Sequence, residues 1–235
     1  MDPTRLILIE GMIGAGKSTT AQWLGGRLAE RGDNAIAYAE FAPDHPVRTK
    51  AVDRLRAAYP EPVWTQNDVG PDGLALDPTA YSVDQWGRLA EHCAREQWTV
   101  VLESTFLQNS VLPLFVNGAP LVKLREIVDR IQDRIAAAEP LLIYLRPTDI
   151  DAAIAHAHAT RDPVWTKWNI ASAESYPFAV ARNLRGRDAV IGLYEEWERV
   201  VDDVLDRWPY RALLVADPQQ DWPAALASIQ AEVES

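Results

Sequence analysis

Short continuous runs of apolar residues alternate along the chain with longer stretches in which apolar residues recur every three or four positions. The short runs are typical of strands buried on both faces, and the longer spacing is typical of amphipathic helices. The strands predicted in this way are 5–10, 35–39, 98–102, 141–145 and 212–215. Because helical stretches separate these runs, the pattern predicts an α/β fold with a parallel sheet.

Helices fill the intervals between the predicted strands. The first follows a glycine-containing loop and is expected to end near Arg31-Gly32, since a basic last turn followed by glycine is a common helix terminus. The two longest apolar stripes are Leu121, Leu124, Val128, Ile131 and Ile135, and Val190, Tyr194, Trp197, Val201, Val204 and Trp208. Such stripes usually pack within their own chain. Their spacing also suits pairing between helices, so a homodimer is the second interpretation.

Composition and charge restrict the compartment and the partners. With 34 acidic and 23 basic side chains the net charge is −11, which would repel a phosphate backbone, so we expect no nucleic-acid partner. No segment approaches the roughly twenty apolar residues that cross a bilayer, so we expect no membrane association. The lone Cys93 fits a reducing cytoplasm and is expected to be buried. The length fits one domain, 1–235, in which the proline-containing stretch 59–78 is a loop.

The segment after the first predicted strand matches the P-loop pattern GxxxxGK[ST] from Gly11 to Ser18. It lies between a predicted strand and a predicted helix, which is the context that this motif requires. Glycines allow consecutive backbone N–H groups to face phosphate oxygens, and the start of the helix adds the positive end of its dipole. The motif therefore predicts a nucleotide phosphate site, whereas a plain glycine turn would not explain the lysine and the serine.

Each position of this loop has an expected role. Lys17 is expected to reach the β- and γ-phosphates, and the Ser18 hydroxyl to bind the Mg²⁺ that bridges them. The residues expected to bind the nucleotide are Gly11, Ile13, Gly14, Ala15, Gly16, Lys17, Ser18 and Thr19. No NKxD motif supports guanine selection, so the expected cofactors are ATP and Mg²⁺.

Two acidic residues stand where ligands collect in a parallel α/β sheet, at the carboxyl ends of strands. Glu40 follows the second predicted strand and Glu103 follows the third. Either side chain could therefore point into a cleft beside the γ-phosphate. The alternative for both is a solvated residue at a strand end.

Four short segments together resemble the deoxynucleoside kinases, within the wider thymidylate kinase-like superfamily. They are Leu8-Ile9-Glu10-Gly11 with the P-loop, Tyr38-Ala39-Glu40-Phe41, Leu102-Glu103-Ser104 and Ile143-Tyr144-Leu145-Arg146. The resemblance spans nearly the whole chain, although only the P-loop is specific. It implies a P-loop NTPase three-layer sandwich with a five-stranded parallel sheet and a helical lid at about 156–187.

The resemblance also implies roles for individual residues. It gives Glu40 the task of taking the proton from the substrate hydroxyl, a form of assistance that typically contributes about 10² to 10⁴-fold. It makes Glu103 a ligand of Mg²⁺, directly or through water. The chain departs from the family at Ser104, because family members usually carry an arginine there that grips the substrate.

Basic residues in the expected lid are candidates for clamping phosphates. Arg161 is the first candidate, and with Glu40 and Lys17 it completes the expected catalytic set. A second cluster comprises Arg182, Arg185 and Arg187, which either faces the phosphates or lies in a solvated loop.

Aromatic and amide side chains predict the acceptor pocket, with rings stacking on a base or sugar and an amide pairing with its edge. The candidates are Phe41, Trp64, Gln85 and Trp86. His45 follows Glu40 closely; we expect it in a solvent-exposed turn, with a substrate contact as the alternative.

The leading hypothesis is an ATP-dependent kinase acting on a hydroxyl of a nucleoside or nucleoside-like small molecule, a class that includes natural products and antibiotics. A nucleoside-monophosphate kinase is the close alternative. An ATP-binding switch or interaction protein is the alternative from another class, since a P-loop alone does not distinguish it from a kinase. The sequence does not identify the acceptor, because the loops that would shape its pocket carry no periodic pattern.

Overall fold

The computed structural model describes residues 4–40, 42, 45–47 and 83–235. The strands are β1 (Leu6–Gly11), β2 (Ala35–Tyr38), β3 (Thr99–Glu103), β4 (Leu141–Arg146) and β5 (Arg211–Ala216). The helices are α1 (Lys17–Glu30), α3 (Val83–Glu96), the π-helical η1 (Leu107–Val111), α4 (Leu112–Val116), α5 (Leu121–Ile135), the 3₁₀ turn η2 (Ala136–Ala138), α6 (Ile150–Thr160), α7 (Pro163–Ser175), α8 (Pro177–Arg182), α9 (Gly186–Arg207) and α10 (Trp222–Glu234). The five predicted strands are confirmed, each within one residue at either end.

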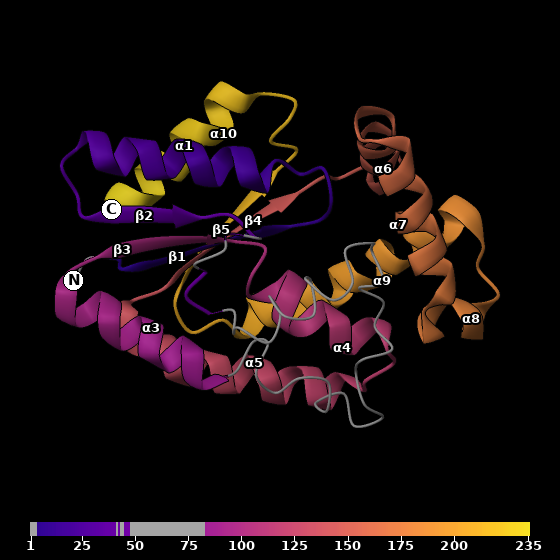
Figure 1. Ribbon diagram of the computed structural model, residues 1–235, viewed down its shortest axis with the longest axis horizontal. Coiled ribbons are helices and arrows are strands. Elements are labelled where there is room, and N and C mark those ends of the chain that lie inside the picture. Colours follow the sequence, from indigo (N-terminus) through magenta and orange to yellow (C-terminus); the bar gives the residue numbers. More distant parts are fainter. Residues whose placement is uncertain (1–3, 41, 43–44, 48–82) are drawn as a thin grey trace.

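The strands form one parallel sheet in the order β2-β3-β1-β4-β5. Helices α1 and α10 cover one face of this sheet, and α3, α5 and α9 lie on the other face (Figure 1). The expected three-layer α/β sandwich is therefore confirmed. The strand β1 occupies the middle of the sheet, so the loop that follows it opens at the centre of the carboxyl edge.

Burial of the strands explains why they read as continuous apolar runs. Every residue of β1 and β3 is buried, as are the first five residues of β4. The outer strands differ, because β2 is half-buried throughout and β5 exposes every second residue. Parallel strands covered on both faces need apolar side chains at successive positions rather than at alternate ones.

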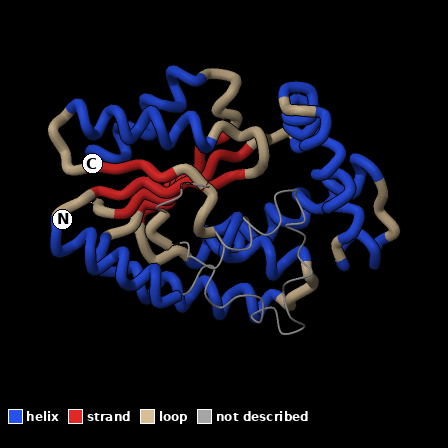
Figure 2. Tube along the Cα trace, viewed as in Figure 1, coloured by secondary structure: helices blue, strands red, loops and turns tan. Residues whose placement is uncertain are grey.

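The helices α6, α7 and α8 lie together beyond one end of the sheet, apart from the two helical layers (Figures 1 and 2). They contain most of the segment 156–187 that was expected to form a lid. An aspartate precedes each of α6 and α7 and caps its first turn: the side chain of Asp149 accepts the N–H of Ala152, and that of Asp162 accepts the N–H of Val164. Closure of this helical group over a ligand stays a prediction.

Most of the apolar stripe on α5 packs inside the chain. Leu124, Val128, Ile131 and Ile135 are buried in the main core, whereas Leu121 is 41% exposed. The single cysteine, Cys93, is also buried, as expected. In the described part of the chain no helix combines the length and the apolar content needed to span a bilayer. The homodimer stays a prediction.

Gly11 ends β1 in a conformation that L side chains rarely adopt, with φ at 149°. A Cβ at this position would lie 2.5 Å from the carbonyl oxygen of Leu145, which is backbone and cannot move aside. We therefore expect Gly11→Ala to lower the free energy of unfolding by about 3 kcal/mol. Denaturant unfolding measures this change.

Gly26 provides the matched control, because it lies inside α1 with no atom within 4 Å of an added Cβ. Gly26→Ala should leave stability unchanged or raise it by about 0.5–1 kcal/mol, as expected for an exposed helical site. Equal effects of the two substitutions would contradict the steric assignment at Gly11.

Candidate functional site

The loop between β1 and α1 contains three glycines with positive φ angles. These are 149° at Gly11, 76° at Gly14 and 92° at Gly16, a region that residues other than glycine rarely occupy. The loop is also closely covered, since a Cβ at Gly14 would lie 3.1 Å from the Cβ of Ala157 on α6. Glycine at these positions therefore permits both the backbone conformation of the loop and its close packing against neighbouring residues.

The segment before α10 supports the same loop from the other side. A Cβ at Gly16 would lie 2.5 Å from Cζ2 of the Trp222 indole. The side-chain amide of Gln219 donates a hydrogen bond to the Gly14 carbonyl oxygen. The P-loop is therefore packed between α6 and the start of α10.

Lys17 begins α1 and folds back over the loop that precedes it. Its ammonium group donates hydrogen bonds to the carbonyl oxygens of Gly11, at 2.9 Å, and Met12, at 2.8 Å. Lys17 is buried, while Ser18 and Thr19 next to it are exposed at the start of the helix. The ammonium and the first amide groups of α1 are thus at one place, which is the arrangement a phosphate chain requires.

Three carboxylates gather beside this ammonium group. Glu10, Glu40 and Glu103 each interact electrostatically with Lys17. Glu103 is buried, and its Oε1 accepts the backbone N–H of Glu40 at 3.3 Å. The structure therefore brings together both acids that were expected at the strand ends, and adds a third from β1.

The described residues contain donors that fit a divalent cation between nucleotide and protein. The Oε2 atom of Glu103 is buried and has no hydrogen-bond partner among the residues that the structure describes. The Ser18 hydroxyl lies at the exposed first turn of α1. A carboxylate oxygen and a hydroxyl are ligands that Mg²⁺ accepts alongside phosphate oxygens and water. Glu103 and Ser18 would be the residues to hold it.

The pKa of Lys17 depends on its burial and on the charged groups that act on it. Burial lowers the pKa of the Lys17 ammonium, and the carboxylates of Glu40, Glu10 and Glu103 oppose that shift. Arg161 lowers it further, which shows that its positive charge acts on the same cluster. Charged groups from the P-loop, from the ends of β1 and β3 and from the far end of α6 thus act on one another.

Glu10 is the site residue to which sequence reasoning gave no role. Its carboxylate is fully buried and accepts the backbone N–H of Phe106 at 2.7 Å and that of Gln108 at 3.1 Å. Burial raises its pKa from 4.5 to about 7, while these N–H groups and Lys17 pull the pKa down. The one sequence signal was an acidic residue at the end of an otherwise apolar, buried strand.

Glu40 is partly exposed and is held by neutral donors. The Gln108 amide donates a hydrogen bond to its Oε1 at 3.3 Å. Burial raises the pKa of Glu40, and Glu103 adds to that rise; Lys17, Asn109 and Gln108 oppose it. The result is a carboxylate of increased basicity next to the P-loop, which is a property required of a general base.

The lid arginines differ in what they contact. The Arg161 guanidinium lies 4.2 Å from the centre of the Trp165 ring. Arg182 stacks on a phenylalanine ring of α8, and Arg187 pairs with Asp151. Arg161 is thus the arginine of the expected lid that acts on the Lys17 cluster, and its role in catalysis stays a prediction.

His45 lies differently from expectation. It is 5% exposed rather than in a solvent-exposed turn, because its ring packs between Tyr38 and Thr105. The Thr105 hydroxyl donates to the Glu103 carbonyl oxygen and accepts from Nε2 of His45, while Nδ1 accepts the Val47 N–H. These bonds assign the neutral Nε2–H tautomer to the ring and tie the segment after Glu40 to the end of β3.

The expected acceptor-pocket residues divide into three groups. Gln85 is half-buried on α3. Trp86 is fully buried with its ring edge-on to Phe106, so it contributes to the core in this structure. Phe41 and Trp64 lie outside the described residues. A role in acceptor binding stays a prediction for all four.

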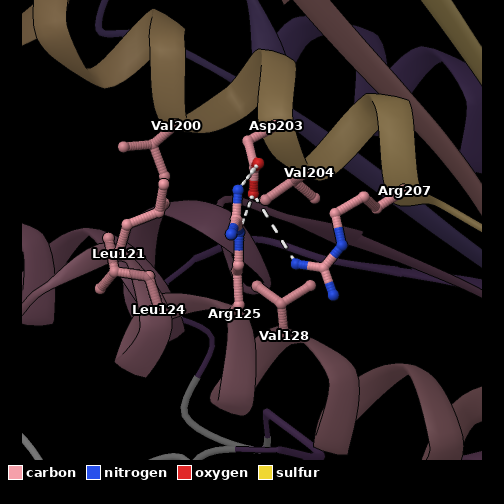
Figure 3. Close-up of a pocket in the computed structure, with 8 residues that line it drawn as sticks. All are labelled: Leu121, Leu124, Arg125, Val128, Val200, Asp203, Val204 and Arg207. Carbon is pink, nitrogen blue, oxygen red and sulfur yellow. Dashed lines mark hydrogen bonds and ion pairs between the residues drawn. The ribbon is translucent and has the colours of Figure 1, made fainter.

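A small recess between α5 and α9 lies on a different part of the surface. In Figure 3, Arg125 of α5 reaches across it to Asp203 of α9, and Arg207, one turn further along α9, also points to Asp203. Arg125 Nε donates to Asp203 at 2.9 Å, and this bond lowers the pKa of the carboxyl. An ion pair therefore occupies the recess, and it shares no residue with the P-loop cluster.

No family model and no curated protein matches this sequence. Solved structures do match along the full chain. Thymidylate kinase from Ehrlichia chaffeensis aligns with a TM-score of 0.53 at 12% identity, covering 99% of each chain. Deoxyadenosine kinase from M. mycoides with bound dCTP aligns with a TM-score of 0.48 at 14% identity, covering 97% of this chain and 98% of that one. The first likeness confirms the P-loop kinase fold.

The raised pKa of Glu10 has a consequence for stability. The folded state holds the proton more tightly than the unfolded chain, so this contribution is fully present below pH 4.5 and is lost as the pH rises through about 7. Between pH 5 and pH 8 we expect wild-type protein to lose about 2.5 kcal/mol more unfolding free energy than Glu10→Gln does. Urea unfolding at the two pH values measures the difference.

Glu126→Gln, at an exposed carboxylate on α5, is the control and should follow the wild type at both pH values. If Glu10→Gln and wild type lose the same amount of stability over this range, the buried carboxyl does not titrate near neutrality.

Proposed function

We propose that this protein transfers the γ-phosphoryl group of ATP to a hydroxyl of a nucleoside or nucleoside-like small molecule. The observation that carries the proposal is the cluster in which Glu40, held at its main chain by Glu103 and at its carboxylate by Gln108, lies within the electrostatic reach of Lys17. It joins a carboxylate able to accept a hydroxyl proton to the cation of a P-loop. The P-loop kinase fold supports the same proposal.

The proposed reaction uses these groups in separate roles. The Glu40 carboxylate accepts the proton of the acceptor hydroxyl, whose oxygen then forms a bond to the γ-phosphorus while the bond to the β–γ bridging oxygen breaks. ADP leaves with the electrons of that bond. Lys17 and the backbone N–H groups of the loop stabilise charge on the transferred group, and Arg161 adds positive charge from the lid side. Mg²⁺, held by Ser18 and Glu103, would supply further charge neutralisation.

The acceptor and the setting are part of the proposal. A nucleoside monophosphate is the second candidate, because the fold also matches thymidylate kinase over its full length. It would need cationic partners for the acceptor phosphate, whereas the described groups that act on Glu40 are, besides the Lys17 assigned to ATP, two neutral amides and a second carboxylate. We expect the protein to act in the cytoplasm on small molecules.

Lys17→Ala removes the ammonium that would contact the β- and γ-phosphates. We expect this variant to lose measurable phosphoryl transfer and to bind ATP at least tenfold more weakly, with the fold retained. Calorimetry with ATP and Mg²⁺, circular dichroism and acceptor-dependent ADP release measure the three properties. Lys123→Ala, at an exposed lysine of α5, should leave them unchanged.

Glu40→Gln keeps the shape of the side chain and removes its capacity to accept a proton. We expect kcat to fall by about 10² to 10⁴-fold with ATP affinity unchanged, on a panel of nucleosides, nucleoside monophosphates and sugar-bearing natural products. Mass spectrometry identifies the phosphorylated product. Nucleotide binding with only slow, acceptor-independent hydrolysis that Glu40→Gln leaves intact would favour an ATP-dependent switch instead.

A further inference from the structure

The segment that follows β3 begins against the side chain of Glu10. The backbone N–H groups of Phe106 and Gln108 donate to its two carboxylate oxygens, at 2.7 and 3.1 Å, and the Leu107 N–H also acts on it. These are the first N–H groups of the helical stretch 107–116, whose own flanking residue Phe106 provides no side-chain cap. A carboxylate from the central strand therefore satisfies the amide groups that a helix start leaves unpaired.

The same helical start holds Glu40. The Gln108 backbone is fixed by Glu10, and its side-chain amide donates to Glu40 Oε1 at 3.3 Å. On the opposite side the Glu40 backbone N–H donates to Glu103. Glu40 is thus fixed at both ends, by β3 through its main chain and by η1 through its carboxylate.

Two of the side chains that hydrogen-bond to the Glu40 carboxylate carry no charge. Gln108 and Asn109 are neutral amides, so they orient a carboxylate without the strong stabilisation that an ionised donor would give it. Ser104, at the turn between Glu103 and this segment, is buried with φ at 56° and is likewise neutral. Each of these amides orients the carboxylate and lowers its pKa less than Lys17 does, which suits a group that must take up a proton.

We propose that Glu10 and Gln108 are positioning residues, in which Glu10 fixes the start of η1 and Gln108 thereby orients the carboxylate of Glu40. The inference rests on the proposed role of Glu40 as the base, and neither positioning residue touches the reacting atoms. It extends the site from the P-loop strand to the acceptor side through a chain of three side chains.

Gln108→Glu tests the link to Glu40, because it keeps the shape of the side chain, removes the donor and adds a like charge. Lys17 from α1, Glu103 from β3, Asn109 from η1 and Tyr194 from α9 also act on Glu40 and stay unchanged. We expect loss of this hydrogen bond to shift the carboxyl ¹³C resonance of Glu40 at one fixed alkaline pH. NMR with the resonance assigned by Glu40→Gln measures the shift without requiring turnover.

Gln230→Glu is the matched control, since Gln230 also donates its amide to a glutamate, Glu234, but on the exposed surface of α10. It should leave the Glu40 carboxyl resonance unchanged. An unchanged Glu40 resonance in Gln108→Glu would overturn the inference whatever the enzyme activity is. Absence of acceptor-dependent turnover in wild-type protein would instead overturn the proposed function, so the two failures are distinguishable.

A double-mutant cycle tests the link from Glu10. Glu10→Gln and Gln108→Ala should each lower kcat by roughly 10- to 100-fold, and Gln108→Ala should leave KM for ATP unchanged. The kcat of the double variant should fall no further than that of the less active single variant. Multiplied losses would show that Glu10 acts independently and would overturn this part. Should Glu10→Gln fail to fold, hydrogen exchange at Phe106 and Gln108 in wild-type protein decides: rapid exchange would contradict the anchoring by Glu10.

Discussion

The ammonium group of Lys17 is buried and carries a charge on which three carboxylates act, and the arrangement of the site depends on it. Taking a charge out of water is unfavourable unless opposite charges and hydrogen bonds replace the water. Here the replacement comes from Glu10, Glu40 and Glu103, and from two carbonyl oxygens of the loop that precedes the lysine. The negative charges are in turn compensated by the lysine, so the loop and the strand ends stabilise one another.

The order of the strands makes this cluster possible. Because β3 lies between β1 and β2, the ends of the three strands that lead to the acids are consecutive along one edge of the sheet. The register pairs Ile9 with Glu103, so Glu10 and Glu103 lie one residue apart along that edge. Glu40 then joins them through its backbone bond to Glu103. A parallel sheet therefore collects side chains that are far apart in sequence into a single electrostatic unit.

Features that depend on local sequence could be predicted, and features that depend on distant partners could not. The P-loop and the strands were predicted because glycine spacing and apolar runs determine them locally. The role of Glu10 was not, because its N–H donors lie 96 and 98 residues away along the chain. The burial of His45 depends on Thr105, 60 residues later, and a histidine beside an aspartate reads locally as a turn. The contact of the Trp86 ring with Phe106, twenty residues later, could not be predicted either, and its role in acceptor binding stays a prediction.

The packing of the P-loop against the segment before α10 also bears on how the chain folds. The bond from Gln219 to Gly14 joins residues separated by 205 positions, and the Trp222 ring covers Gly16 from the same segment. Contacts of such long sequence separation form late, because closing the intervening chain must come first. During synthesis on a ribosome, the loop formed by residues 11–18 would therefore emerge long before Gln219 and Trp222, which pack against it. A nascent chain that does not yet include Gln219 and Trp222 would contain the whole P-loop sequence but would lack the contacts that these two residues make with it.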